Sequence, residues 1–178
     1  AADQVDRPNS GPGIRLAGGV LGAEISQNVV RANLGHGIVL ADAATSGTLL
    51  YRNQVTGNTL DGLRLDGGSG NVVGGIGSAW LNEFRANGAF GVRVASGNGN
   101  VIRGNIVSEH AQAIVLGTGH PPNDPYDLDG GANQQLNRPV AFTSAYGPTT
   151  WELAWGLMSA ANTQFTVELD NGHRVLSY

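Results

Sequence analysis

Two arginines at equivalent positions of neighbouring strand-like segments are the first candidates for binding chemistry. Arg64 lies in the segment 62–65 and Arg93 in the segment 91–94, each between two apolar residues. Alternation along a strand turns both guanidinium groups outward when the apolar neighbours face inward. Like charges on adjacent strands repel each other, so these side chains need a carboxylate such as Asp66, water or an anionic ligand. An exposed face with counter-ions is the simpler interpretation, and an acidic polysaccharide is the alternative.

A loop rich in Asp, Asn, Gly and Pro is the candidate metal site. Asp124, Asp127 and Asp129 supply the hard carboxylate oxygens that Ca²⁺ prefers, with Asn123 and Asn133 nearby. The spacing lacks the full EF-hand pattern, and Asp and Asn often bond their own backbone in turns. We therefore expect no cofactor and keep calcium at these three carboxylates as the alternative.

The remaining carboxylates are poor candidates for acid–base catalysis. Such an enzyme needs two carboxylates that converge on one bond, whereas Asp42, Asp61, Asp66 and Glu83 fall in successive repeats at different repeat positions. The sequence shows no cluster of Asp with His and a basic residue, no histidine pair with metal-ligand spacing, and no nucleophile or phosphate-loop motif. We interpret these carboxylates as solvated turn residues, which favours a non-enzymatic protein. A polysaccharide lyase or hydrolase is the alternative.

Four copies of one repeat must position these residues. Their equivalent positions 37, 62, 91 and 113 are 25, 29 and 22 residues apart, a period typical of repeat architectures. Each copy alternates apolar and polar residues with a period of two, as strands do, and carries no helical stripe. The 28 Gly among 178 residues also oppose a helical domain. Copies joined head to tail and stacked in register form parallel sheets, that is, a β-solenoid.

Stacking in register predicts columns of identical or similar side chains. The inward apolar columns are Ile38, Leu63, Val92 and Ile114; Leu40, Leu65, Val94 and Leu116; Val30, Val55, Phe84 and Val107; and, at the start of each copy, Ile25, Leu50, Ala79 and Ile102. The Asn columns are Asn28, Asn53, Asn82 and Asn105, and Asn33, Asn58, Asn87 and His110. Asn tolerates a left-handed corner, and its amide can bond the identical amide one turn away.

Glycines and connections complete the repeat. Corners that need positive φ or close approach of the backbone are expected at Gly13, Gly37, Gly62 and Gly91. The copies differ most in the connection after the last strand, and residues 66–78 would form the longest one. Insertions in one connection map to one side of a solenoid.

Two phrases in the chain resemble those of a known family. The sequences Asn-Val-Ile-Arg-Gly-Asn at 100–105 and Asn-Val-Val-Gly-Gly-Ile-Gly at 71–77 are similar to those of bacterial secreted right-handed parallel β-helix proteins, in the pectate-lyase-like superfamily. Residues 122–139 resemble the stretch that closes the helix in such surface proteins, and residues 157–163 resemble the opening of a following β-sandwich. The resemblance covers residues 13–170 and implies a fold and secretion. It implies no single activity, because this fold hosts lyases, hydrolases, adhesins and spacers.

We predict an all-β chain built around a right-handed parallel β-helix of about five coils. The helix spans residues 13–116, after an N-terminal extension at residues 1–12. Residues 117–138 form the Asp/Asn/Gly/Pro-rich loop, and residues 139–178 form a C-terminal β segment. That segment offers four strand-like stretches, fewer than the roughly seven of an immunoglobulin-like sandwich, and so resembles an incomplete β-sandwich.

The incomplete segment and the ends of the solenoid predict self-assembly. Val175, Leu176 and Tyr178 lie in a last strand that could pair with another subunit. A head-to-tail contact that does not close gives a filament. We expect a secreted or cell-surface structural protein, either a filament subunit or part of an adhesin. A glycan-binding module for acidic polysaccharide and an excerpt of a longer surface protein are the alternatives.

Composition excludes several other classes. The net charge is −4, which opposes a nucleic-acid footprint. No apolar run approaches the length needed to span a membrane. The chain has no Cys, so disulfides do not stabilise it and redox chemistry does not indicate its compartment.

Overall fold

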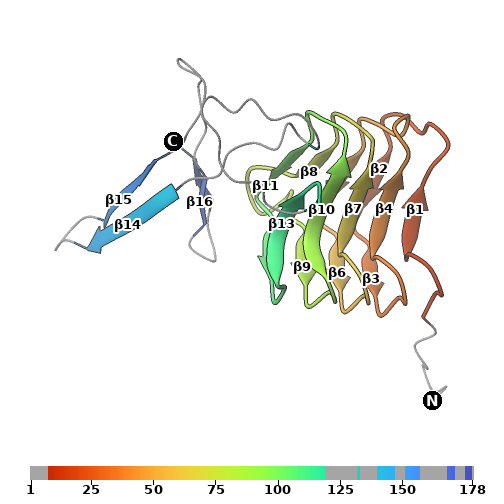
Figure 1. The fold of residues 1–178 in the computed structure, drawn as a ribbon, viewed down its shortest axis with the longest axis horizontal. Helices are drawn as coiled ribbons and strands as arrows, with labels where there is room; N and C mark the ends of the chain where they lie inside the picture. Colours follow the sequence, from red (N-terminus) through yellow and green to blue (C-terminus); the bar gives the residue numbers. More distant parts are fainter. Residues whose placement is uncertain are drawn as a thin grey trace.

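The computed structural model describes residues 8–118, residue 132 and four short strands near the C-terminus. Figure 1 shows the turns of one solenoid side by side, from β1 at the N-terminal end to β13 at the other. Every strand pair within this solenoid is parallel. The predicted parallel β-solenoid is therefore confirmed.

Each turn contributes one strand to each of three sheets. The five-stranded sheet contains, in spatial order, β1 (Ile14–Leu16), β4 (Ile38–Ala41), β7 (Leu63–Asp66), β10 (Phe90–Ser96) and β13 (Gln112–Leu116). The second sheet contains β2 (Glu24–Ser26), β5 (Leu49–Tyr51), β8 (Val72–Gly74) and β11 (Val101–Arg103). The third contains β3 (Val29–Arg31), β6 (Gln54–Thr56), β9 (Glu83–Arg85) and β12 (Ile106–Ser108). Because two of the three sheets have four strands, the solenoid has about four turns rather than the five expected.

The inward columns form the core, and three of the four are confirmed in the predicted register. Leu63 pairs with Ile38 on one side and with Val92 on the other. These three side chains have no accessible surface, whereas Ile114 in the last turn is 36% exposed. A side chain in a middle turn is covered from both directions, and one in an end turn is covered from a single direction.

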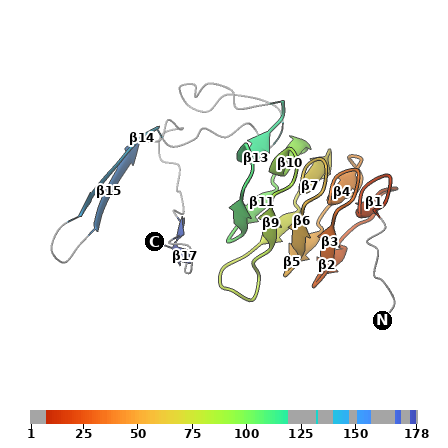
Figure 2. The same cartoon turned by 90° about the horizontal axis from the view of Figure 1, so that it is seen from below.

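The fourth column was predicted wrongly in the third repeat. The residue between Leu50 and Ile102 is the fully buried Val73, not Ala79, which is exposed. Val73 lies in β8, within the stretch that we had assigned to a connection. The extra residues of this turn lie instead between β8 and β9, in a loop that protrudes from the stack near β9 (Figure 2). Burying a Val removes more apolar surface from water than burying an Ala, so this register is the more stable one.

Both Asn columns form hydrogen-bonded ladders, as predicted. In a typical rung the backbone N–H and the side-chain Nδ2 of one Asn donate to Oδ1 of the Asn in the following turn, as Asn53 does to Asn82 at 3.0 and 2.9 Å. The second ladder begins before Asn33, the first residue of the predicted column, because Asn9 Nδ2 donates to Asn33 Oδ1 at 3.0 Å. Satisfying these amides matters because an unpaired buried polar group costs about 1–3 kcal/mol.

A third ladder lies at the start of the second sheet. The backbone N–H of Thr48 donates to Asn71 Oδ1 at 2.9 Å, and Asn71 Nδ2 donates to Asn100 Oδ1 at 2.8 Å. This ladder was not predicted, because the sequence pattern assigns Asn71 to a connection between repeats.

The left-handed corners do not lie at the ladder Asn residues. The residue before most of them has positive φ, including Gln27, Ala32, Arg52, Gly57, Ala86 and Gly104. Nor do the repeat glycines need positive φ. A Cβ on Gly37 would lie 2.3 Å from Val55 Cγ1 and 2.6 Å from the carbonyl oxygen of Gly62. Close approach is thus the reason for glycine at this position.

The C-terminal strands form two antiparallel pairs. These are β14 (Val140–Tyr146) with β15 (Trp151–Gly156), and β16 (Glu168–Asp170) with β17 (Val175–Ser177). Ala132 belongs to the hydrophobic core cluster of the solenoid and is 4% exposed. Among the described residues no helix has the length and apolar character that a membrane crossing requires.

Candidate functional site

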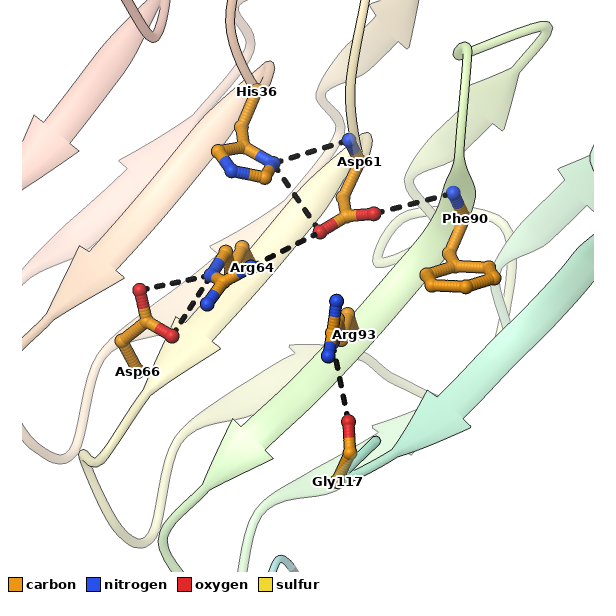
Figure 3. Close-up of polar contacts among 7 residues, drawn as sticks. All are labelled: His36, Asp61, Arg64, Asp66, Phe90, Arg93 and Gly117. Carbon is orange, nitrogen blue, oxygen red and sulfur yellow. Dashed lines mark hydrogen bonds and ion pairs between the residues drawn. The ribbon is translucent and has the colours of Figure 1, made fainter. Parts of the chain in front are cut away.

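A cluster of charged side chains lies on the outer surface of the five-stranded sheet (Figure 3). Arg64 and Asp66 belong to β7 and Arg93 to β10, while His36 and Asp61 lie in the corners before β4 and β7. Arg64 and Arg93 are register partners, so the two arginines lie one turn apart as predicted. Stacking of the repeats thus brings together residues from three turns.

Arg64 is neutralised inside the cluster. Its Nε donates to both carboxylate oxygens of Asp66, at 2.8 and 2.9 Å, and its Nη1 lies 3.9 Å from Asp61 Oδ2. The hydrogen bond to Asp66, followed by the charges of Asp66 and Asp61, raises the pKa of Arg64 against the opposing effect of burial. A carboxylate, water or an anionic ligand was expected beside Arg64, and the partner in the structure is the carboxylate of Asp66.

Arg93 has neutral partners. Its Nε donates to the carbonyl oxygen of Gly117 at 3.2 Å, and its guanidinium carbon lies 5.7 Å from the centre of the Phe90 ring. The second contact is within the range of a cation–π interaction. Arg93 therefore keeps its positive charge uncompensated by any carboxylate in the described part of the chain.

Asp61 is the buried centre of the cluster, with 2% of its surface exposed. Its Oδ1 accepts a hydrogen bond from the backbone N–H of Phe90 at 3.3 Å. Its own N–H donates to His36 Nδ1 at 3.1 Å, and Oδ2 lies 3.2 Å from the same nitrogen. A nitrogen that accepts the amide proton cannot also donate to Oδ2. In this arrangement Oδ2 is buried without a hydrogen-bond donor, and the nearby Arg64 charge is its main compensation.

This cluster was not predicted: Asp61 and Asp66 were interpreted from the sequence as solvated turn residues, whereas Asp61 is buried. The sequence did contain a signal for this stacking. His36, Asp61 and Phe90 occupy the same repeat position, because each directly precedes a repeat glycine. Residues at one repeat position stack one turn apart. The contacts of Asp61 hold the charged groups in place and link three consecutive turns. The carboxylate oxygen that lacks a donor is buried, so it does not face a ligand from solvent.

The other two candidate carboxylates lie elsewhere. Asp42 binds its own corner and that of the preceding turn: Oδ2 accepts the N–H of Gly18 at 2.7 Å, and Oδ1 accepts the N–H of Ala44 at 3.1 Å and that of Thr45 at 2.9 Å. These bonds, chiefly the one from Gly18, lower the pKa of Asp42. Glu83 lies in β9 of the third sheet. Asp42 is thus a turn residue, as interpreted from the sequence, whereas Glu83 is half-buried in a strand, so its interpretation as a solvated turn residue was wrong.

The candidate calcium and assembly residues are only partly covered by the structure. Asp124, Asp127, Asp129 and Tyr178 lie outside the described residues, and Val175 and Leu176 lie in β17, whose side chains are not described. Within residues 8–118, no three His, Asp or Glu side chains are grouped in a way that could hold a metal ion.

A second surface, on the outer face of the second sheet, was also missed. The rings of Tyr51 and Trp80 lie 4.8 Å apart, and Trp80 is 44% exposed. Leu49 and Val101 on the same sheet are 39% and 43% exposed. The alternation of apolar and polar residues identifies only the inward columns, so these outward apolar residues were not recognised from the sequence.

Comparison with known proteins agrees with the fold. A family model described as a right-handed β-helix region matches residues 5–123, which is more than half of the chain. No curated protein matches the chain, and neither does any solved structure.

Proposed function

Because the chain belongs to the right-handed β-helix family, we propose that it is a non-enzymatic structural segment of an extracellular surface protein. In this proposal it assembles head to tail through the ends of its solenoid, as a filament or as part of an adhesin.

The observation that carries this proposal is the open edge of β1. In the described residues β1 pairs with β4 on one side and with no strand on the other. Its inward residues Ile14 and Leu16 are only partly buried, whereas Leu63 and Leu65 in the middle turns have no accessible surface. An unpaired edge with incompletely covered apolar columns favours the addition of another strand.

The opposite end supplies the complementary strands. There β11, β12 and β13 end their three sheets, and Ile102, Val107 and Leu116 remain partly buried. Ala132 belongs to the same core cluster. Contact between the two different ends of neighbouring molecules is heterologous, so it extends indefinitely unless its rotation closes a ring.

Arg15 allows a direct test of the edge. Since the N–H of Ile14 donates to Gly37 across the β1–β4 ladder, the backbone groups of Arg15 face the open side. Arg15→Pro removes the donor on that side and spares the ladder, and Arg15→Ala removes only the side chain. We expect the mass of the wild type and of Arg15→Ala to rise with concentration in sedimentation velocity, and Arg15→Pro to remain monomeric. A monomeric wild type, or association of Arg15→Pro equal to that of wild type, contradicts the proposal.

A second candidate function is binding or cleavage of an acidic polysaccharide on the face of Arg64 and Arg93. Arg93 favours it, because this guanidinium has no carboxylate partner in the described residues. Arg64 weighs against it, because Asp66 and Asp61 already compensate its charge. The structural proposal therefore has the stronger support.

The two candidates differ in their response to polysaccharide. Binding to pectin or alginate that is lost in Arg93→Gln and kept in Arg15→Ala would favour the carbohydrate function. Ultraviolet absorbance of an unsaturated uronate, or new reducing ends, would identify a lyase or a hydrolase. We expect neither binding nor product.

A further inference from the structure

We propose that Asn98 is a site of spontaneous deamidation and isoaspartate formation, while the Asn ladders resist the same reaction. This inference is independent of the proposed function. It rests on two of the three Asn-Gly sequences of the chain, Asn87-Gly88 and Asn98-Gly99: Asn87 is buried and Asn98 is exposed, whereas Asn171-Gly172 lies outside the described residues.

The reaction needs an accessible side-chain amide and an unhindered following nitrogen. The backbone nitrogen of the next residue loses its proton and attacks Cγ of Asn, and the side-chain nitrogen leaves as ammonia. Water then opens the resulting succinimide at either carbonyl, which yields Asp or isoaspartate. The net change is the uptake of one water and the loss of one ammonia, and no protein nucleophile or cofactor is required.

Asn98 and Gly99 meet these requirements. Both are exposed, in the corner between β10 and β11. Gly99 is surrounded by open space, since a Cβ placed there would meet only the backbone nitrogen of Gly70, at 4.0 Å. Glycine also lacks the side chain that would shield its nitrogen from Cγ.

Asn87 is protected by the same fold. It is 4% exposed, and its Nδ2 donates to the carbonyl oxygen of Val55 at 2.9 Å. Its Oδ1 accepts two hydrogen bonds from Asn58, at 3.1 and 2.9 Å. The attacking nitrogen, that of Gly88, donates to the carbonyl oxygen of Asn58 at 2.7 Å. The reaction at Asn87 therefore requires the ladder to open first.

Several other ladder residues are shielded by the residue that follows them. Asn28, Asn71, Asn100 and Asn105 each precede Val or Ile. A side chain branched at Cβ crowds the nitrogen that would have to attack.

Modification of Asn98 has a structural consequence close by. Asp or isoaspartate adds a negative charge to this corner, and isoaspartate also inserts a methylene into the main chain two residues before Asn100. Asn100 Oδ1 accepts hydrogen bonds from the N–H and Nδ2 of Asn71, at 3.1 and 2.8 Å. Displacement of Asn100 would lengthen these bonds of the third ladder.

The test is incubation of the full chain at mildly alkaline pH, followed by peptide mapping with mass spectrometry. We expect Asn98 to convert to Asp and isoaspartate at least about tenfold faster than Asn87 in the folded protein. In urea the two Asn-Gly sites should react at similar rates, because protection of Asn87 depends on folding. In the peptide that contains residue 98, Asn98→Gln should abolish the fast conversion, since attack on its longer side chain closes a less favourable ring; Asn171-Gly172 is followed in a separate peptide. Equal rates at Asn87 and Asn98 in the folded protein, or fast conversion of the residue-98 peptide that persists in Asn98→Gln, would overturn the proposal.

Discussion

His110 occupies the ladder position that Asn33, Asn58 and Asn87 fill in the earlier turns. Its Nε2 lies 3.2 Å from both the backbone nitrogen and the Nδ2 of Asn87. The ring nitrogen therefore accepts the hydrogen bonds that an Asn side-chain oxygen accepts in the earlier turns. This requires Nε2 to be unprotonated. Burial lowers the pKa of His110, and the charge of Glu109 opposes that effect.

The lowered pKa gives folding a pH dependence with a defined sign. The folded chain binds the proton more weakly than the unfolded chain, whose histidine has a pKa of about 6.5. The contribution to stability is complete above that value and falls as the pH drops through it. We expect acidification to lower the melting temperature of the wild type more than that of His110→Asn, which restores an amide that does not titrate in this range. Parallel pH profiles in a thermal unfolding series would contradict this assignment.

Some contacts of individual side chains could be predicted from the sequence, and others could not. The Asn columns were predictable, because identical residues at one repeat position must stack. The stacking of His36 on Asp61 was also predictable, because both precede a repeat glycine. The contact of Asp61 with Arg64 was not, because it joins a corner to the strand that follows it. The sequence gives the period of the turns but not the direction in which side chains at a corner point.

Among the structural elements, the strands were predicted better than the corners between them. Alternation fixed the inward face of β4, β7 and β10, since a slip by one residue would turn their apolar side chains to water. It failed at β8, where two stretches of the same turn, 72–74 and 78–80, could each supply the inward residue. Only the packing of Val73 between neighbouring turns distinguishes them.

The corner before β4 depends on the absence of a side chain at Gly37. A Cβ on Gly37 would overlap Val55 and the backbone of the next turn. We expect Gly37→Ala to destabilise the chain by about 2–4 kcal/mol, since a rigid backbone atom cannot move aside as a side chain can. Urea unfolding measures the loss.

Gly11→Ala is the matched control for this substitution. A Cβ on Gly11 meets no atom within 4 Å, and its φ is not positive. The urea unfolding midpoint of Gly11→Ala should equal that of the wild type. If Gly37→Ala is equally well tolerated, the close approach seen at this corner does not limit stability.

The whole solenoid is held together by contacts between neighbouring turns. Each strand of the three parallel sheets pairs only with the equivalent strands of the turns before and after it. In such a stack, stability is approximately a sum over turns and the interfaces between them. End turns have one interface and middle turns have two.

This arrangement predicts a gradient of local stability along the stack. Backbone amides of β7 should exchange with deuterium more slowly than those of β1 or β13, because opening a middle turn breaks two interfaces. Hydrogen exchange followed by mass spectrometry of peptides measures this order. Uniform protection from β1 to β13 would show that the solenoid opens as a single unit.

The ladders give the stack a chemical direction. In all three of them a residue of the earlier turn donates to the ladder side chain of the later turn, as Asn28 does to Asn53 and Asn71 does to Asn100. Within the described residues, the first ladder therefore begins with an Asn whose side chain accepts no ladder bond, Asn28, and ends with one that donates none, Asn105. Two identical ends brought face to face would oppose acceptor to acceptor or donor to donor. A duplicated internal turn, by contrast, would meet matching groups on both sides, so this fold can lengthen by gene duplication without any change to its ladder residues.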